Sequence, residues 1–405
     1  MTAVQDTSSV VGAPQVQDHH CPGCRATMRP FFEVTDVPVN SCILMKSAQE
    51  ARRYPLGNIV LGFCEDCGFI RNLAFDPQLA EYSGRYEETQ GYSATFRDFH
   101  ERLAKDLIDR YNLRDKDILE IGCGKGEFLA LLCELGGNRG VGFDPGYDND
   151  RGILDDIADT RIVADFFSQK YADERADLVC CKMTLEHIQD TAEFVSLSRQ
   201  AMRPDGSSVL YYQVPESMRI LEQCAFEDIY YEHCSYFTTG SLARLFIANG
   251  FGILDIRTEY DGQYLAIEAE LARDSAPKLP AAYDDLAAVR QQAESFPERC
   301  TVKINSWRES LNSARERGAV VIWGSGSKAV SFLGAVDKDG AIDRVVDINP
   351  YRQSHFMPGT GQPIVAPQDL KTQPPATIVV MNSIYREEIR SILNKLDVEA
   401  DILCL

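Results

Sequence analysis

A tyrosine, a glutamate and a histidine stand close together in the second half of the chain, which reads Tyr230-Tyr231-Glu232-His233. A histidine can remove a proton from a substrate, a carboxylate can orient that histidine, and a tyrosine hydroxyl can donate a hydrogen bond to a developing oxyanion. The motif therefore predicts a centre for acid–base chemistry. A polar loop near a strand end, without a catalytic role, would contain the same residue types.

Two cysteine pairs have the spacing of a metal site. Cys21 and Cys24 form the first pair, and Cys64 and Cys67 form the second. Four thiolates presented by two turns suit a tetrahedral structural zinc, which would stabilise a region too small for a large core of its own. A redox pair or a chance spacing is the alternative, and one of the two histidines just before Cys21 could replace a sulfur.

A glycine-rich turn near residue 124 indicates a nucleoside ligand. The stretch 117–121 predicts a buried strand, from which Gly122, Gly124 and Gly126 lead into a helix. These glycines lack Cβ atoms and let the backbone approach a ligand, while the helix start offers unpaired N–H groups. Asp144 ends the next expected strand, where its carboxylate can accept hydrogen bonds from ribose hydroxyls.

The glycine spacing separates two classes of cofactor. A dinucleotide fingerprint expects a small residue where this chain has Glu127, whereas the glycines here recur at every second position. The pattern resembles that of the class I S-adenosylmethionine (SAM) methyltransferases. The resemblance implies that Glu120 helps to hold the amino-acid end of SAM and that Ala164 and Asp165 meet its adenine. A dinucleotide-binding domain, or a turn without a ligand, is the alternative.

The resemblance also implies the elements that position these residues. It predicts an α/β fold with a Rossmann-like class I methyltransferase core, in which 176–180 forms the fourth strand and 208–213 a later one. His187 follows the fourth strand, at the carboxyl edge where open α/β sheets bind ligands. A charged amphipathic helix is expected from about Thr95 to Tyr111.

Over nearly its whole length the chain resembles a narrower family, the C-methyltransferases of nucleotide-linked 3-keto or 4-keto deoxysugars. Its members join a four-cysteine zinc domain, a SAM-binding domain with a Tyr-x-Glu-His motif and a second Rossmann-like α/β domain. The resemblance implies His233 as general base, Glu232 as its partner or a substrate ligand, and Tyr230 as a donor to the sugar. His187 would be a further acceptor-site histidine. The neighbouring Glu232 would favour the charged form of His233, so burial must keep this histidine neutral.

One segment departs from that family. Many members carry a Tyr-x-Tyr-His-Ser-Ser-like stretch before the SAM domain, whereas this chain has Arg85-Tyr-Glu-Glu-Thr-Gln90. The chain thus lacks the hydrogen-bond donors of His-Ser-Ser, and Glu87 or Glu88 adds negative charge. These differences would suit a hydroxyl-rich or amine-bearing acceptor. Three tyrosines of this region are expected to cover the acceptor pocket, unless they serve in packing alone. They are Tyr82, Tyr86 and Tyr92.

A second glycine turn lies near the C-terminus. Gly324 and Gly326 follow an apolar strand and Asp347 ends the next one, which on spacing alone is a fair dinucleotide fingerprint. An NAD-linked oxidoreductase is therefore an alternative function. The resemblance favours the family's C-terminal domain, in which a helix start would meet the acceptor's diphosphate. The residues expected there are Ser325, Ser327 and Lys328.

The 405 residues are enough for two or three domains. A formal charge of −20 argues against a nucleic-acid partner, and no apolar run reaches the roughly 20 residues that span a bilayer. We therefore expect a cytoplasmic protein without a membrane partner. The expected parts are a flexible tail (1–18), a zinc-binding domain (19–76), a SAM-binding domain with an N-terminal lid helix (77–270), a helical linker (271–317) and a C-terminal Rossmann-like domain (318–405).

These observations favour a SAM-dependent enzyme that methylates carbon of a nucleotide-linked keto-deoxysugar through an enolate. Methylation of oxygen or nitrogen on a similar acceptor is the nearest alternative. A non-enzymatic assembly module that keeps a relic cofactor fold is another, against which the intact glycines and Asp144 speak. The oligomeric state is left open.

Overall fold

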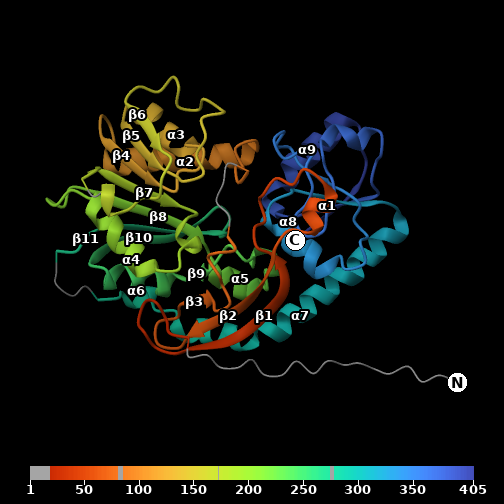
Figure 1. The fold of residues 1–405 in the computed structure, drawn as a ribbon, viewed down its shortest axis with the longest axis horizontal. Helices are drawn as coiled ribbons and strands as arrows, with labels where there is room; N and C mark the ends of the chain where they lie inside the picture. Colours follow the sequence, from red (N-terminus) through yellow and green to blue (C-terminus); the bar gives the residue numbers. More distant parts are fainter. Residues whose placement is uncertain (1–18, 81–84, 172, 274–277) are drawn as a thin grey trace.

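Three β-sheets organise the chain (Figure 1). The computed structural model describes residues 19–80, 85–171, 173–273 and 278–405. Tyr82 and the tail expected at 1–18 therefore lie outside the described residues.

The largest sheet has seven strands in the order β10-β11-β8-β7-β4-β5-β6. Five neighbouring strands, from β8 to β6, run parallel, while β11 is antiparallel to both β8 and β10. This topology confirms the expected α/β core. The strands are β4 (Asp117–Ile121), β5 (Arg139–Phe143), β6 (Thr160–Val163), β7 (Leu178–Lys182), β8 (Val209–Pro215), β10 (Phe251–Glu259) and β11 (Tyr264–Leu271).

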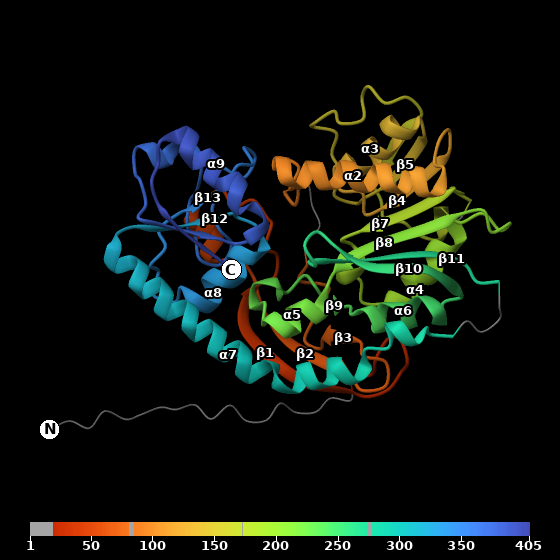
Figure 2. The same ribbon diagram turned by 180° about the vertical axis from the view of Figure 1, so that it is seen from behind.

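Helices cover both faces of this sheet (Figures 1 and 2). On one face α2 (Ala94–Tyr111) and α3 (Glu127–Gly136) bury Phe99, Leu107 and Leu129 against the strands. On the other face α4 (Thr191–Ser198) and α6 (Thr239–Ala248) form a second apolar layer. The helix predicted from Thr95 begins at Ala94, because the Ser93 side chain accepts a hydrogen bond from the Phe96 N–H.

A four-stranded antiparallel sheet follows the N-terminus, in the order β1-β2-β3-β9. It is built from β1 (Met28–Pro38), β2 (Leu56–Cys64), β3 (Ile70–Asn72) and β9 (Ser235–Tyr236), with α1 (Ala48–Arg52) between the first two strands. The last strand comes from a distant part of the sequence, directly after the Tyr-Glu-His motif. The N-terminal region therefore shares a sheet with the segment expected to do chemistry.

The C-terminal region forms a parallel sheet in the order β14-β13-β12-β15-β16. Its strands are β12 (Val320–Trp323), β13 (Val345–Val346), β14 (Ile364–Val365), β15 (Thr377–Val380) and β16 (Asp401–Cys404). Its helices are α8 (Ser327–Val336) and α9 (Arg386–Leu396). The long α7 (Leu286–Arg317) runs below the N-terminal sheet to this region, and α5 (Ser217–Gln223) lies beside it (Figure 2).

The C-terminal sheet does not enclose a separate core on both faces. One face, with Val321 and Ile378, has its own apolar cluster with α9. The other face joins a cluster that continues through α7 to Ile59 and Phe63 of the N-terminal sheet. The C-terminal sheet therefore shares the apolar cluster on one of its faces with the N-terminal sheet.

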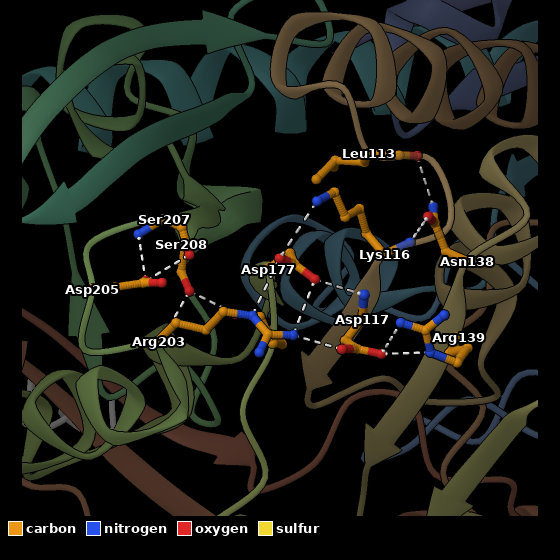
Figure 3. A network of polar contacts seen from close by, with 11 residues as sticks. Leu113, Lys116, Asp117, Asn138, Arg139, Asp177, Arg203, Asp205, Ser207 and Ser208 are labelled. Atoms are coloured by element: carbon orange, nitrogen blue, oxygen red, sulfur yellow. Dashed lines mark hydrogen bonds and ion pairs between the residues drawn. The ribbon is translucent and has the colours of Figure 1, made fainter.

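Charged residues fix the amino ends of the central strands (Figure 3). Asp117 accepts hydrogen bonds from Arg139 at 2.7 Å and from Arg203 at 2.6 Å, and Arg203 also donates to Asp177 at 3.2 Å. This network connects the strand starts at the edge opposite the glycine turn.

No described helix is both long and apolar enough to cross a membrane.

The carboxylate of Glu388, in α9, connects the C-terminal region to the start of α2. It accepts hydrogen bonds from the Ala94 N–H at 3.2 Å, the Thr95 N–H at 3.2 Å and the Ser93 hydroxyl at 2.6 Å. A helix start has unpaired N–H groups and a partial positive charge, so a carboxylate stabilises it. Glu388 therefore caps a helix that belongs to another sheet.

We expect Glu388→Ala to lower the free energy of unfolding by about 1–2 kcal/mol, because it removes the acceptor of the Ala94 and Thr95 N–H groups in the first turn of α2. Urea unfolding followed by circular dichroism measures the loss. The matched control is Glu387→Ala, since Glu387 precedes Glu388 in the same helix and its side chain is 79% exposed. Equal losses for the two variants would contradict the capping role.

Candidate active site

A cavity of about 620 Å³ lies between the seven-stranded sheet and the C-terminal sheet. Its walls come from the turns after β4, β5 and β7, from the connector 86–93, from the segment 228–233 and from the start of α8. Both glycine turns and the Tyr-Glu-His motif therefore meet around one space.

The first glycine turn lies at the carboxyl end of β4. Gly122 has a φ of 69°, and a Cβ there would lie 2.0 Å from the Thr184 hydroxyl oxygen, so a larger residue does not fit. Asp144 accepts hydrogen bonds from the Gly124 N–H at 2.9 Å and the Gly146 N–H at 2.8 Å. Burial raises the pKa of Asp144, while these two N–H groups act in the opposite direction. Asp144 thus shapes the turn and also faces the cavity.

Four of the expected cofactor residues line the cavity, namely Glu120, Gly122, Gly124 and Asp144. Gly126 instead begins α3 as its N-cap, and Ala164 and Asp165 are not part of the lining. The half-buried Asp165 accepts hydrogen bonds from the Tyr171 hydroxyl at 2.7 Å and from Lys170 at 3.2 Å.

The cavity wall after β6 is formed by Phe166 and Phe167. This aromatic pair directly follows the two residues expected to meet adenine. It could have been found from the sequence, because aromatic rings are common partners for a flat base.

His187, Tyr230 and His233 come together as expected. The ring centroids of His187 and His233 are 4.8 Å apart, and those of Tyr230 and His233 are 4.0 Å apart. Burial holds the pKa of His233 well below its usual value, and the neighbouring His187 acts in the same direction. Burial also lowers the pKa of His187. Both imidazoles are therefore neutral near pH 7 and able to accept a proton.

The structure corrects the expected role of Glu232. This residue is fully buried, but its carboxylate turns away from the cavity and accepts hydrogen bonds from the Ser41 N–H at 2.8 Å and from Asn40 at 3.1 Å. Because the chain turns at this point, adjacent residues project in different directions. Glu232 therefore attaches the motif to the segment after β1.

The carboxylate that faces His233 belongs to Glu186, which sequence reasoning missed. Its Oε1 lies 3.9 Å from His233 Nε2, and its Oε2 and His233 Nδ1 have no hydrogen-bond partner among the described residues. Burial raises the pKa of Glu186 to about 8. The signal was present in the sequence, because Glu186 directly precedes His187 after the fourth strand of the core.

The connector before α2 also reaches the cavity. Tyr86, Glu88 and Tyr92 line it, whereas Glu87 does not. Glu87 forms an ion pair with Arg151 and accepts a hydrogen bond from Asn349 at 2.8 Å. Of the two glutamates expected to add charge to the acceptor site, Glu88 thus lines the cavity, whereas the charge of Glu87 is compensated outside it. Burial raises the pKa of Glu88 to about 7.

The C-terminal glycine turn places Ser325, Ser327 and Lys328 on the cavity wall. Ser325 donates its N–H to Asp347 at 2.8 Å, and the hydroxyl oxygens of Ser327 and Ser41 are 2.6 Å apart. Lys328 Nζ lies 2.8 Å from the Asp228 carboxylate. The same wall contains Arg219 and Arg352, two buried or partly buried cations that were not expected from the sequence.

The four cysteines of the N-terminal region form a compact cluster. The sulfurs of Cys21 and Cys67 are 3.5 Å apart, and those of Cys24 and Cys64 are 3.4 Å apart. All four sulfurs lie within 4.8 Å of one another. Ligands of a tetrahedral zinc, each about 2.3 Å from the metal, need separations of this size.

The chain is similar to known methyltransferases in two separate regions. Residues 92–256 match a methyltransferase domain family, and residues 285–400 match the C-methyltransferase C-terminal domain family. C-methyltransferase NovU of Streptomyces niveus is 28% identical over 312 residues, which is 72% of each chain. Across these two regions the protein is therefore similar to C-methyltransferases. It is therefore an enzyme with a class I SAM methyltransferase core and a second, C-terminal α/β domain, as the resemblance implied.

Other methyltransferases share part of this C-methyltransferase chain. Ubiquinone biosynthesis O-methyltransferase of Saccharophagus degradans is 26% identical over 136 residues, or 31% of this chain and 55% of that protein. The solved 1,6-didemethyltoxoflavin-N1-methyltransferase of Burkholderia thailandensis is 20% identical with a TM-score of 0.37, covering 44% of this chain and 81% of its own. The match of 285–400 to a C-methyltransferase domain favours the family interpretation of the second glycine turn over an NAD-linked oxidoreductase.

We expect Glu186→Gln to change how stability depends on pH. Because burial raises the folded pKa of Glu186 to about 8 from a usual 4.5, the folded protein binds more protons than the unfolded chain between these pH values. This carboxyl therefore lowers stability as pH rises. The variant should match the wild type near pH 5 and exceed its free energy of unfolding near pH 8.5, on the order of 1–3 kcal/mol.

Urea unfolding at several pH values tests this expectation. Glu193→Gln, on the exposed side of α4, controls for the removal of one acidic group. A stability difference between Glu186→Gln and the wild type that stays constant from pH 5 to 8.5 would contradict the buried, protonated state of Glu186.

Proposed function

We propose that this C-methyltransferase adds a methyl group to carbon of a nucleotide-linked keto-deoxysugar through a base-assisted enolate. The observation that carries the proposal is the group of Tyr230 with the buried His233 and Glu186 on the wall of a cavity shared by both α/β domains. SAM, when bound, supplies the electrophilic methyl group. The remaining chemistry is the removal of a proton and the stabilisation of an oxyanion. We assign both to side chains of this protein.

His233 is the proposed general base. A hydrogen on the carbon next to a ketone is a weak acid, so its removal needs a neutral base at hydrogen-bond distance. Burial keeps the pKa of His233 low, and its Nδ1 has no partner among the described residues. Glu186, whose Oε1 lies 3.9 Å from Nε2, is protonated near pH 7, and a positive charge on His233 would then favour its ionised form.

Tyr230 is the proposed donor to the enolate oxygen. Burial raises its pKa well above the usual value, so its hydroxyl keeps the proton and donates a hydrogen bond. His187, the other imidazole beside His233, would contact the acceptor on the same side. Tyr86 and Tyr92 would cover it from the connector, as residues of the cavity wall.

The nucleotide part would lie against the C-terminal domain. Ser325, Ser327 and Lys328 surround the start of α8, where unpaired N–H groups and a partial positive charge favour a diphosphate. Arg219 and Lys328 both contact the Asp228 carboxylate. A bound diphosphate would share these cations with Asp228.

The rest of the cavity supports a cofactor lying along the sheet edge. Glu120, Gly122, Gly124 and Asp144 line it and suit the amino-acid end and the ribose of SAM. We assign the adenine of SAM to the wall formed by Phe166 and Phe167. The four-cysteine cluster is proposed as a structural zinc site, since four sulfurs leave no open position on the metal.

We expect His233→Ala to keep its affinity for S-adenosylhomocysteine within about twofold and to lose turnover by about 10²–10⁴, the usual contribution of a general base. The wild type should exchange the hydrogen next to the ketone for deuterium when nucleotide-linked 3-keto and 4-keto deoxysugars are incubated in heavy water. Mass spectrometry measures exchange and methylation in the same samples.

His355→Ala is the matched control, because this half-buried histidine lies in the C-terminal domain outside the cavity wall. Wild-type exchange in His233→Ala would exclude His233 as the base. Methylation without any exchange, in a product whose new methyl group is on oxygen or nitrogen, would establish the alternative to the carbon route.

We expect Cys64→Ser to lose bound zinc together with soluble yield, because three sulfurs hold the metal less tightly and the N-terminal sheet depends on it. Metal analysis should find about one zinc per wild-type chain. Cys404→Ser is the control, since Cys404 lies half-buried in β16, far along the chain from the cluster. A folded Cys64→Ser protein with an unchanged zinc content would overturn the assignment.

A further inference from the structure

The order of the strands sets a direction for any nucleoside in the cavity. The strands β6, β5, β4 and β7 lie side by side. Phe167 follows β6, Asp144 follows β5, Gly122 follows β4 and Lys182 ends β7, and all four line the cavity. A cofactor with its base at Phe167 and its ribose at Asp144 therefore extends its amino-acid end toward Lys182.

Lys182 is an unusual residue for this position, because a lysine is rarely so buried. It is only 9% exposed and lies at the carboxyl edge of the seven-stranded sheet, beneath α2 and α3. Its Nζ lies 2.8 Å from His100 Nε2 and 3.7 Å from the centre of the Phe128 ring. An ammonium donates in every hydrogen bond it makes, so His100 accepts through Nε2. His100 is itself held against Phe96, with ring centroids 4.1 Å apart.

The hydrogen-bond partner of Lys182 carries no charge. Burial and the neighbouring Lys182 lower the pKa of His100 to about 2, so the imidazole is neutral. Burial of an ammonium is costly unless an anion compensates it. A neutral imidazole and an aromatic face compensate it in part, and the third N–H of the ammonium can serve a ligand.

A carboxylate with an unsatisfied oxygen faces the same space. Glu120 is 3% exposed, and its Oε2 has no hydrogen-bond partner among the described residues. Burial raises the pKa of Glu120 to about 7, and Lys182 acts in the opposite direction. One buried cation and one buried acid thus lie beside the turn where the amino-acid end of a nucleoside cofactor would arrive.

We propose that Lys182, held in place by His100 and Phe128, binds the α-carboxylate of SAM while Glu120 receives its α-ammonium group. The pair matches the two opposite charges of an amino acid, and hydrogen bonds between ionised groups are the stronger kind. This assignment rests on the SAM-dependent family and does not depend on the acceptor. Its failure would leave the proposed carbon methylation untouched.

A second buried lysine of the cavity provides the matched control. Lys125 lies in the glycine turn and is 8% exposed, with its Nζ 3.4 Å from Asp148. It belongs to the adenosine side of the cavity, next to Asp144. A general effect of removing a buried cation would appear in both lysines, whereas recognition of the carboxylate belongs to Lys182 alone.

Calorimetric titration of the full-length protein with three compounds tests the proposal. S-adenosylhomocysteine carries the carboxylate, its decarboxylated analogue lacks it, and 5′-methylthioadenosine lacks the whole amino acid. The wild type should prefer S-adenosylhomocysteine over the decarboxylated analogue by about tenfold or more. Lys182→Met should lose most of this preference and still bind 5′-methylthioadenosine like the wild type, which also verifies its fold.

Lys125→Met should keep the wild-type preference, even if its affinity for all three compounds falls. An unchanged preference in Lys182→Met would overturn the proposal. So would an equal loss of preference in both lysine variants. If Lys182→Met fails to fold, Lys182→Gln provides the same comparison, because glutamine keeps a hydrogen-bond donor but has no charge. A retained preference for S-adenosylhomocysteine in that variant also contradicts the assignment.

Discussion

The pairing of β9 with β3 fixes the Tyr-Glu-His motif in space. Ile70 pairs with Tyr236 and Arg71 with Ser235, while the Asn72 N–H donates to the Cys234 carbonyl at 3.0 Å. These contacts begin one residue after His233, so this histidine, the proposed base, cannot move independently of the N-terminal sheet. The four-cysteine cluster includes Cys64, the last residue of β2 in that sheet. A metal there would stabilise the loop that holds the base.

Burial decides the protonation of the groups on the cavity wall. It keeps the pKa of His233 low and raises the pKa of Glu186 to about 8 and that of Glu120 to about 7. In each case desolvation is the largest cause of the shift, and for Glu120 it outweighs the attraction of Lys182. A neutral imidazole and carboxyls close to their titration point are suited to moving protons near neutral pH. The same residues in an exposed loop would carry ordinary charges.

Three carboxylates connect parts of the chain that are distant in sequence. Glu232 binds Ser41, Glu87 binds Asn349 and Arg151, and Glu388 binds the start of α2. Each lies beside the cavity wall, and together they hold the two α/β domains and the N-terminal region around one space. Glu232 and Glu87 are buried and Glu388 is half-buried. Because a carboxylate removed from water needs donors, these contacts are specific and do not simply add apolar area.

The sequence alone determined the elements whose signals are local. The glycine spacing after Ile121, the carboxylate at Asp144 and the two cysteine pairs each depend on a few neighbouring residues, and the structure has the expected strand, turn and helix at the first glycine turn. Tertiary structure decided which side chains meet. It turned Glu232 toward Ser41, brought Glu186 to His233 and placed Lys182 on His100, because side-chain direction and burial depend on contacts between segments that the linear sequence does not specify.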